Sequence, residues 1–160
     1  MIAIVAVDKN WGIGKDGEQI VYIPGDLKRF KDFTTGNTII LGRKTMYTFP
    51  GKKPLKNRRN LILSRNPEFK VEGGEVYSGL EELMAHVTDP DNTYVVGGAM
   101  VYNTMIDQCD RAYITKIDAQ YPADCWFPNL DDDPNWEVES EGEWLEHEGV
   151  RFRYVNYRRK

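Results

Sequence analysis

The segment Thr93-Tyr94-Val95-Val96-Gly97-Gly98 indicates the fold class most directly. β-Branched and aromatic residues favour a strand, and the glycine pair ends the apolar run. Residues 99–106 then show a helical pattern, and residues 38–41 repeat the order of apolar run, glycine and predicted helix. Continuous apolar runs of this length are typical of parallel strands buried on both faces.

The remaining segments continue this alternation and then change. We expect further strands at Ile2–Val7, 61–63 and 75–78, and helices at 26–34, 43–49 and 80–87. Residues 112–117, 136–140 and 152–157 are predicted as strands without long helices between them. The sequence therefore predicts one α/β domain over residues 1–160, with a mostly parallel central sheet flanked by helices on both faces and C-terminal antiparallel strands.

Length and composition exclude several classes of protein. The chain has 160 residues, of which 41% are hydrophobic and 29% charged, as in an ordinary globular domain with its own core. No apolar run approaches the ~20 residues that cross a bilayer, and no signal peptide is evident, so we expect a cytoplasmic protein without a membrane partner. The cysteines Cys109 and Cys125 and the histidines His86 and His147 show no ligand spacing, so we expect no metal site.

Charge is unevenly distributed along the chain. The net charge is -4, which argues against a nucleic-acid partner. Residues 28–70 nevertheless contain twelve basic and two acidic side chains. This bias favours a small anionic ligand on one face, with chance clustering on a solvated surface as the alternative.

Polar and basic residues follow several of the predicted strands. Open α/β sheets bind ligands at the carboxyl ends of their strands. The residues there are Asp8, Gly42, Arg43, Lys44, Thr45, Ser64, Arg65, Ser78, Gly97 and Gly98. A glycine before a helix leaves backbone N–H groups free for phosphate, and the basic side chains add charge. The pattern indicates a ligand with several phosphates, although each junction alone is also typical of a tight turn.

Asp26 is the most informative acidic residue. It follows Pro24-Gly25 at the start of a predicted helix, where an N-cap is the structural interpretation. Leu27 and Phe30 lie near it, so the carboxylate is alternatively the base of an apolar pocket that recognises an amidine-like group. Lys31 and Arg58 are then either solvated surface or receivers of anionic groups farther out.

The chain resembles the dihydrofolate reductase family from Met1 to its C-terminus. The resemblance rests on the order and spacing of residues 4–8, 12–17, 23–31, 41–45, 58–65, 95–102, 115–119 and 123–128. It implies that NADPH donates a hydride to the pteridine ring of dihydrofolate, giving tetrahydrofolate, while the protein positions and polarises the ring. It also implies antifolates as small-molecule ligands, and we expect a monomer.

The resemblance further implies roles for individual residues. Asp26 matches the pocket carboxylate that binds the amino group and the N3 side of the pterin and favours protonation at N5. Thr115 matches the threonine that forms a hydrogen bond with this carboxylate. Tyr102, near the nicotinamide, completes the expected catalytic set. The substrate would contact Ile4, Ala6, Asp26, Leu27, Phe30, Lys31, Phe49, Leu55, Arg58, Val96 and Thr115, with Arg58 on the glutamate α-carboxylate. The cofactor would contact Ala6, Ile13, Gly14, Gly42, Arg43, Lys44, Thr45, Leu63, Ser64, Arg65, Ser78, Gly97, Gly98, Ala99, Met100, Val101 and Tyr102. Arg65 favours a 2′-phosphate, and hence NADPH over NADH.

The glycine-punctuated segment from residue 8 to residue 24 shows no periodic pattern, which predicts a long loop. By the resemblance, it matches the lid that closes over the nicotinamide, and Asp124 matches a supporting residue on a second loop. Most relatives carry Leu or Met followed by Pro-Trp in the lid, where this chain has Gln19, Ile20 and Val21. The family tryptophan positions a water beside the pterin, so we expect a different route of proton delivery. We also expect weaker binding of diaminopyrimidine antifolates such as trimethoprim. Met100 stands where a basic residue often assists the pyrophosphate.

Three alternatives stay open at this point. The first is another NADPH-dependent reductase of this fold, acting on a pyrimidine or a different pterin, which would have little need for Arg58 and Lys31. The second is a non-catalytic nucleotide-binding module, which would have no use for Asp26 and Thr115. The third is a globular domain without a ligand, against which the agreement among the strand ends argues.

Overall fold

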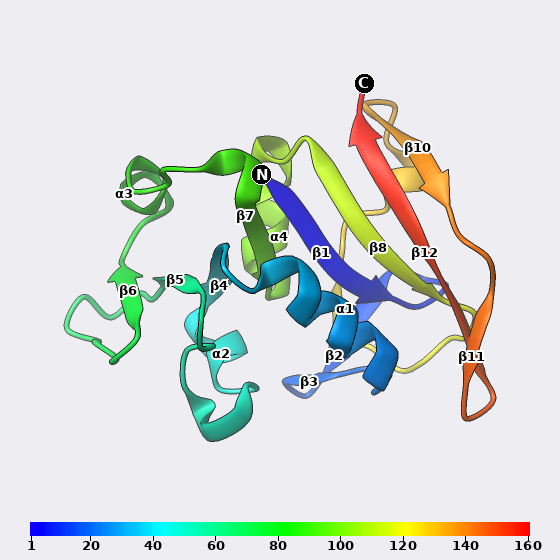
Figure 1. Cartoon of the computed structure of the whole chain (residues 1–160), viewed down its shortest axis with the longest axis horizontal. Helices are drawn as coiled ribbons and strands as arrows, with labels where there is room; N and C mark the ends of the chain where they lie inside the picture. The colour runs from blue at the N-terminus through cyan, green and yellow to red at the C-terminus, as the bar shows by residue number, and fades with distance from the viewer.

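The main sheet contains nine strands in a computed structural model that describes residues 1–160. Its order is β10-β12-β8-β1-β7-β4-β5-β6, with β11 paired to β12. The parallel strands are β1 (Ile2–Val7), β4 (Thr38–Gly42), β5 (Arg59–Leu63), β6 (Gly74–Tyr77), β7 (Thr93–Gly97) and β8 (Arg111–Ile117). The antiparallel strands are β10 (Trp136–Glu141), β11 (Leu145–His147) and β12 (Val150–Arg159). The predicted fold class is confirmed (Figure 1).

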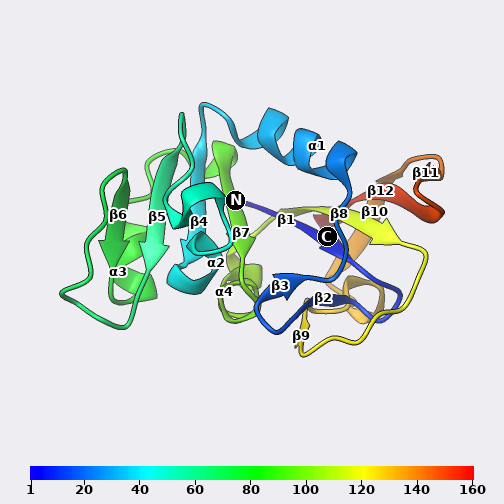
Figure 2. The ribbon, with the colours of Figure 1, turned by 90° about the horizontal axis from the view of Figure 1, so that it is seen from below.

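Helices cover both faces of this sheet, as predicted. Ile39 and Ile62 pack toward α1 (Pro24–Thr34) and α2 (Arg43–Met46). The adjacent residues Ile40 and Leu61 pack in a second cluster with α3 (Leu80–Ala85) and α4 (Ala99–Met105). Figure 2 shows α1 on one side of the sheet and α4 on the other. Because successive side chains of a strand point to opposite faces, these central strands are apolar throughout rather than alternating.

The long antiparallel strand β12 lies beside β8, and their register positions the site described below. Tyr154 pairs with Thr115, and Asn156 pairs with Tyr113. Directly opposed residues of an antiparallel pair project on the same face. These four side chains therefore share one face of the ribbon.

The segment between β1 and α1, predicted as a long loop, contains two short strands. β2 (Gly12–Lys15) pairs with β3 (Glu18–Gln19) and with β9 (Cys125–Trp126) in a separate three-stranded sheet. The expectation of an irregular segment is wrong here. Glycines and charged residues in strands this short show no apolar alternation, and the partner β9 is more than one hundred residues away.

Several helix boundaries differ from the predictions. α1 begins at Pro24 with Ile23 as its N-cap residue and no side-chain cap, so the N-cap interpretation of Asp26 is wrong. α2 and α3 end earlier than expected, at Met46 and Ala85. Short 3₁₀ turns are Pro50–Lys52, Pro90–Asn92, Ile106–Gln108 and Leu130–Asp132. None of the helices combines the length and apolar character that a bilayer crossing requires.

Candidate functional site

Asp26 and Thr115 meet between α1 and β8, as the resemblance implies. The buried Thr115 hydroxyl donates to Asp26 Oδ1 at 2.5 Å. Burial raises the pKa of the half-buried Asp26 carboxyl, whereas the Thr115 hydrogen bond and the Arg29 charge act in the opposite direction. No protein group donates to the second oxygen, Oδ2, so this oxygen is free to accept a hydrogen bond from a ligand.

Apolar side chains gather beside this carboxylate. Five of the expected substrate contacts pack around one core cluster: Ile4, Phe30, Phe49, Leu55 and Val96. Ala6 packs instead with the lid residues Ile20 and Val21 in a smaller cluster. Leu27, one residue after Asp26, exposes 36% of its surface. The structure therefore gathers five of the expected apolar contacts in one cluster, on the side of the sheet that α1 covers.

Arg58 lies near the end of α1 with part of its guanidinium free. Its Nη2 donates to Thr35 Oγ1 at 3.1 Å, and its buried Nε has no partner. Burial lowers the pKa of Arg58. A buried donor without an acceptor is costly, and a ligand carboxylate is a suitable partner. Lys31 is exposed and forms no ion pair within 4.0 Å, so the structure gives it no fixed position toward a ligand.

The ends of β4 and β7 approach closely at glycines. A Cβ added to Gly98 would lie 3.2 Å from Thr45 Oγ1, and one added to Gly42 would lie 3.4 Å from Val101 Cγ2. Gly97 adopts a φ of +127°, a conformation that side chains other than glycine rarely adopt. The helix α4 follows without a side-chain cap, which leaves its first N–H groups for a ligand. This cradle fits a pyrophosphate group.

Three basic side chains lie at the same edge of the sheet. The Arg43 guanidinium carbon is 3.8 Å from the centre of the Phe69 ring, and Arg43 Nε donates to the Tyr47 hydroxyl at 2.6 Å. Arg65 Nη2 donates to Met100 Sδ at 3.5 Å, which joins the ends of β5 and α4. The third, Lys44, is exposed, and none of the three forms an ion pair within 4.0 Å. All three charges therefore remain available to phosphate groups.

The remaining expected cofactor contacts differ in whether they lie beside the glycine cradle and have a hydrogen-bonding group free for a ligand. Tyr102 is buried beside Gly97, and its hydroxyl donates to the Ile4 carbonyl at 2.7 Å. Ser64 Oγ accepts from the backbone of Asn66 at 3.3 Å, which leaves its O–H as a donor. Ser78 follows the edge strand β6, is exposed, and makes no side-chain hydrogen bond. Leu63 packs with the core on the α3 and α4 side.

Asp124 binds the lid segment, as expected for a supporting residue. Its Oδ2 accepts from the Asp16 backbone N–H at 3.0 Å, and its own N–H donates to the Gly14 carbonyl at 2.9 Å. The hydrogen bond from Asp16 holds the pKa of this exposed carboxyl below its usual range. Ile13 and Gly14, two expected cofactor contacts, are thereby fixed in β2.

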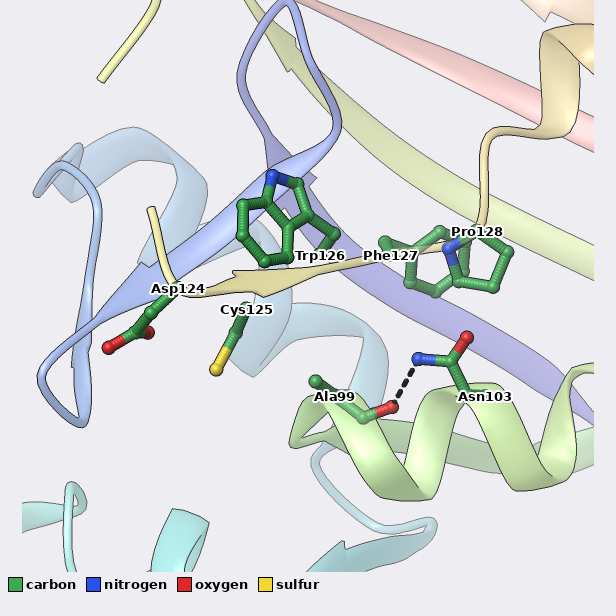
Figure 3. A pocket seen from close by; sticks show the side chains of 7 residues that line it. All are labelled: Ala99, Asn103, Asp124, Cys125, Trp126, Phe127 and Pro128. Atoms are coloured by element: carbon green, nitrogen blue, oxygen red, sulfur yellow. Dashed lines mark hydrogen bonds between the residues drawn. The ribbon is translucent and has the colours of Figure 1, made fainter. Parts of the chain in front are cut away.

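A hollow of about 400 Å³ lies between α4 and the strand β9 (Figure 3). Its lining consists of Ala99, Asn103, Asp124, Cys125, Trp126, Phe127 and Pro128. Asn103 Nδ2 donates to the Ala99 carbonyl at 2.7 Å on the helix side. Ala99 is an expected cofactor contact, so this hollow adjoins the glycine cradle rather than the Asp26 carboxylate. No group of three or more His, Cys, Asp or Glu side chains is placed to hold a metal ion.

Sequence reasoning assigned no role to two residues that shape the site. Arg29 lies three residues after Asp26 on α1 and is half-buried. The i, i+3 spacing on a helix is the signal that could have identified it. The buried Asp8 carboxylate accepts from the backbone N–H groups of Asn10 and Gly12, both at 2.8 Å, and of Tyr121 at 3.0 Å, and so holds the base of the lid. Nothing in the local sequence indicates the contact with Tyr121.

Fold and site together define an α/β protein of the class that binds a phosphate-bearing ligand at the carboxyl ends of its strands. A family model described as dihydrofolate reductase matches residues 1–159. Dihydrofolate reductase of Bacillus subtilis is 34% identical over 159 residues, covering 98% of this chain and 93% of the relative. Dihydrofolate reductase of Mycobacterium leprae is 37% identical over 152 residues, covering 92% of this chain and 90% of the relative.

A solved structure gives the same result. Dihydrofolate reductase from Enterococcus faecalis, complexed with NADP(H) and RAB-propyl, superimposes on this chain with a TM-score of 0.85 and is 33% identical in sequence. The superposition covers 99% of this chain and 95% of the Enterococcus faecalis chain. The chain belongs to the dihydrofolate reductase family. It is an oxidoreductase that reduces dihydrofolate with NADPH.

Proposed function

We propose that Asp26 binds and polarises the pterin ring of dihydrofolate. The observation that carries this proposal is the 2.5 Å hydrogen bond from Thr115, which fixes one carboxylate oxygen and leaves the other for the ring. The free oxygen would accept from the pterin amino group and the N3 side. A carboxylate partly removed from water stabilises a cationic ring, and this favours protonation at N5.

The glycine cradle and the basic strand ends would hold NADPH. Gly97, Gly98 and the first N–H groups of α4 would bind the pyrophosphate. Arg43, Lys44 and Arg65 carry charges without carboxylate partners, which suits the adenosine phosphates and favours a 2′-phosphate. When bound, NADPH supplies the hydride. Tyr102, buried beside Gly97, would border the nicotinamide site.

The substrate's glutamate tail would lie at the far end of α1. The unpartnered Nε of Arg58 is the donor that supports this placement, and Lys31 would add positive charge nearby. A reductase that acts on a pyrimidine without such a tail has no use for this buried donor. We also propose that the protein acts as a monomer. The two free cysteines suit a reducing cytoplasm.

The lid would work without the tryptophan that most relatives carry. Val21 and Ile20 pack with Ala6 against a cluster that contains Ile23, and neither side chain offers a hydrogen-bond donor. Proton delivery at N5 would therefore not depend on a water held by an indole. The altered rim of the substrate pocket would also weaken the binding of diaminopyrimidine antifolates. Nanomolar inhibition by trimethoprim would remove this part of the proposal.

The decisive experiment follows the loss of NADPH absorbance when dihydrofolate is added, with NADH as the control, in the parent and in Asp26→Asn. We expect turnover that prefers NADPH in the parent. In Asp26→Asn we expect the greatest loss at neutral pH and a smaller loss in acid, where the ring is protonated without help. Equal activity of the two proteins at every pH would refute the role of Asp26.

A further inference from the structure

We propose that Arg29 is a positioning residue that holds the Asp26 carboxyl in its ionised form in the free enzyme. The inference rests on the proposed function, because it concerns the protonation state of the group assigned to the pterin. It assigns a role to a side chain that is not itself among the expected substrate or cofactor contacts.

The first argument is the placement of Arg29 relative to Asp26. Residues three apart on a helix are neighbours on its surface, so both side chains leave the same side of α1. Asp26 is bound by Thr115, and the Arg29 guanidinium carbon lies 3.9 Å from the centre of the Tyr154 ring. Thr115 and Tyr154 are directly paired across β8 and β12. The carboxylate and the guanidinium therefore pack on adjacent side chains of one sheet face.

The second argument is that Arg29 has no other counter-charge. It forms no ion pair within 4.0 Å, and its one hydrogen bond, from Nη2 to Asn156 Oδ1 at 3.3 Å, is to a neutral amide. Its guanidinium carbon is also 5.1 Å from the Phe33 ring centre and 5.9 Å from that of Tyr113. Aromatic faces stabilise a cation but do not neutralise it. In this partly desolvated setting, its field acts on Asp26 more strongly than that of a solvated lysine.

The third argument is the set of groups that face Asp26. On the sheet these are Thr115 of β8 and Tyr154 of β12, and Tyr113 of β8 shares their face beside Arg29. Tyr102 of α4 also acts on Asp26, and the neighbouring part of β1 is apolar. Burial is the main cause that raises the pKa of Tyr154 and of Tyr102, so both are neutral at physiological pH. Arg29 is the one charged group among them, and its charge opposes the effect of burial on Asp26.

The test is a direct titration of the Asp26 carboxyl in the protein labelled with ¹³C at aspartate carboxyls, with Asp26→Asn to assign the signal. The variants are Arg29→Met, which removes the charge at similar length, and Arg29→Lys, which keeps it. Lys28→Met is the matched control, because it removes one charge from the adjacent, exposed position of α1. Arg29→Gln, which keeps a donor for Asn156, replaces Arg29→Met if that variant does not fold.

We expect the Asp26 signal of Arg29→Met to titrate at higher pH than that of the parent, with Arg29→Lys and Lys28→Met unchanged. The pH profile of kcat/KM reports the ionisation of groups in the free enzyme. On its acid limb, kcat/KM of Arg29→Met should be about threefold or more lower than that of the parent at the same pH. A parent-like titration of Arg29→Met would overturn the inference. Equal shifts in Arg29→Met and Arg29→Lys would also overturn it, because packing rather than charge would then be the cause. The titration needs no turnover, so an inactive parent would refute the proposed function without deciding this inference.

Discussion

Replacing Thr115 by valine isolates the hydrogen bond that fixes Asp26. Valine has nearly the same shape as threonine and suits a β-strand, so β8 and the packing around this buried residue are preserved. What disappears is the 2.5 Å donation to Asp26 Oδ1. The change therefore tests one interaction and not the fold.

The size of the effect follows from the kind of hydrogen bond. Hydrogen bonds to charged groups contribute about 1.5–3 kcal/mol, and each 1.4 kcal/mol is a factor of ten. The 2.5 Å separation places this bond among the short, charge-assisted ones. We expect kcat/KM to fall by about 10- to 150-fold if the whole contribution is realised when the ring is bound. The hydrogen bond also lowers the pKa of Asp26, so its loss should move the acid limb of the profile to higher pH.

The assay measures kcat/KM for dihydrofolate at saturating NADPH across the pH range, together with thermal unfolding. Thr93→Val is the matched control, because Thr93 is also fully buried on a strand and its hydroxyl donates at 2.7 Å to the carbonyl of Asp89, away from the site. We expect Thr93→Val to lose stability but to keep kcat/KM. A Thr115→Val protein with parent-like kcat/KM and an unmoved acid limb would show that the hydrogen bond does not serve catalysis.

Three further outcomes are expected. Burial raises the pKa of Asp26 in the folded protein above its ordinary value of 3.8. The free energy of unfolding should therefore decrease as the pH rises from this ordinary value through the raised pKa of the folded state. Asp26→Asn should then be more stable than the parent at neutral pH in urea titrations, and an equal or lower stability there would contradict the burial argument. Gly97→Ala should lose about 1–3 kcal/mol of stability because of its φ of +127° and should bind NADPH more weakly in fluorescence titration. Gly25→Ala, where the space is open, is its stability control, and a Gly97→Ala protein as stable as that control would disprove the strain. Arg65→Gln should raise the KM for NADPH about tenfold and leave that for NADH unchanged; a parallel rise for both would remove the 2′-phosphate assignment.

The central sheet could be predicted because its strands carry their own local signal. The apolar run of residues 38–41 has no polar alternation, and Gly42 ends it where the structure ends β4. The same holds for residues 93–96 before the glycine pair. Such a strand is buried on both faces wherever it lies in the sheet, so its pattern does not depend on which strands become its neighbours.

The lid sheet could not be predicted, because its strands have no pattern of their own. Gly12–Lys15 becomes a strand only by pairing with Cys125–Trp126, and this pairing depends on a fold already formed. Asp124 then fastens the two segments through the Asp16 backbone, a contact in which the identity of Asp16 has no part. Local propensity carries no information about such a contact, and only the resemblance to the family indicated it.

The carboxylate site falls between these two cases. The helical spacing places Asp26 relative to Leu27 and Phe30, but after Pro24-Gly25 the pattern alone favours the other interpretation, an N-cap. The state of the carboxyl depends on a balance that no single segment contains. Burial beneath α1 raises its pKa, Thr115 of β8 lowers it, and Arg29 lowers it from a position fixed by Tyr154 of β12. A side chain whose charge state depends on three elements can be located from sequence, but its chemistry follows only from their packing.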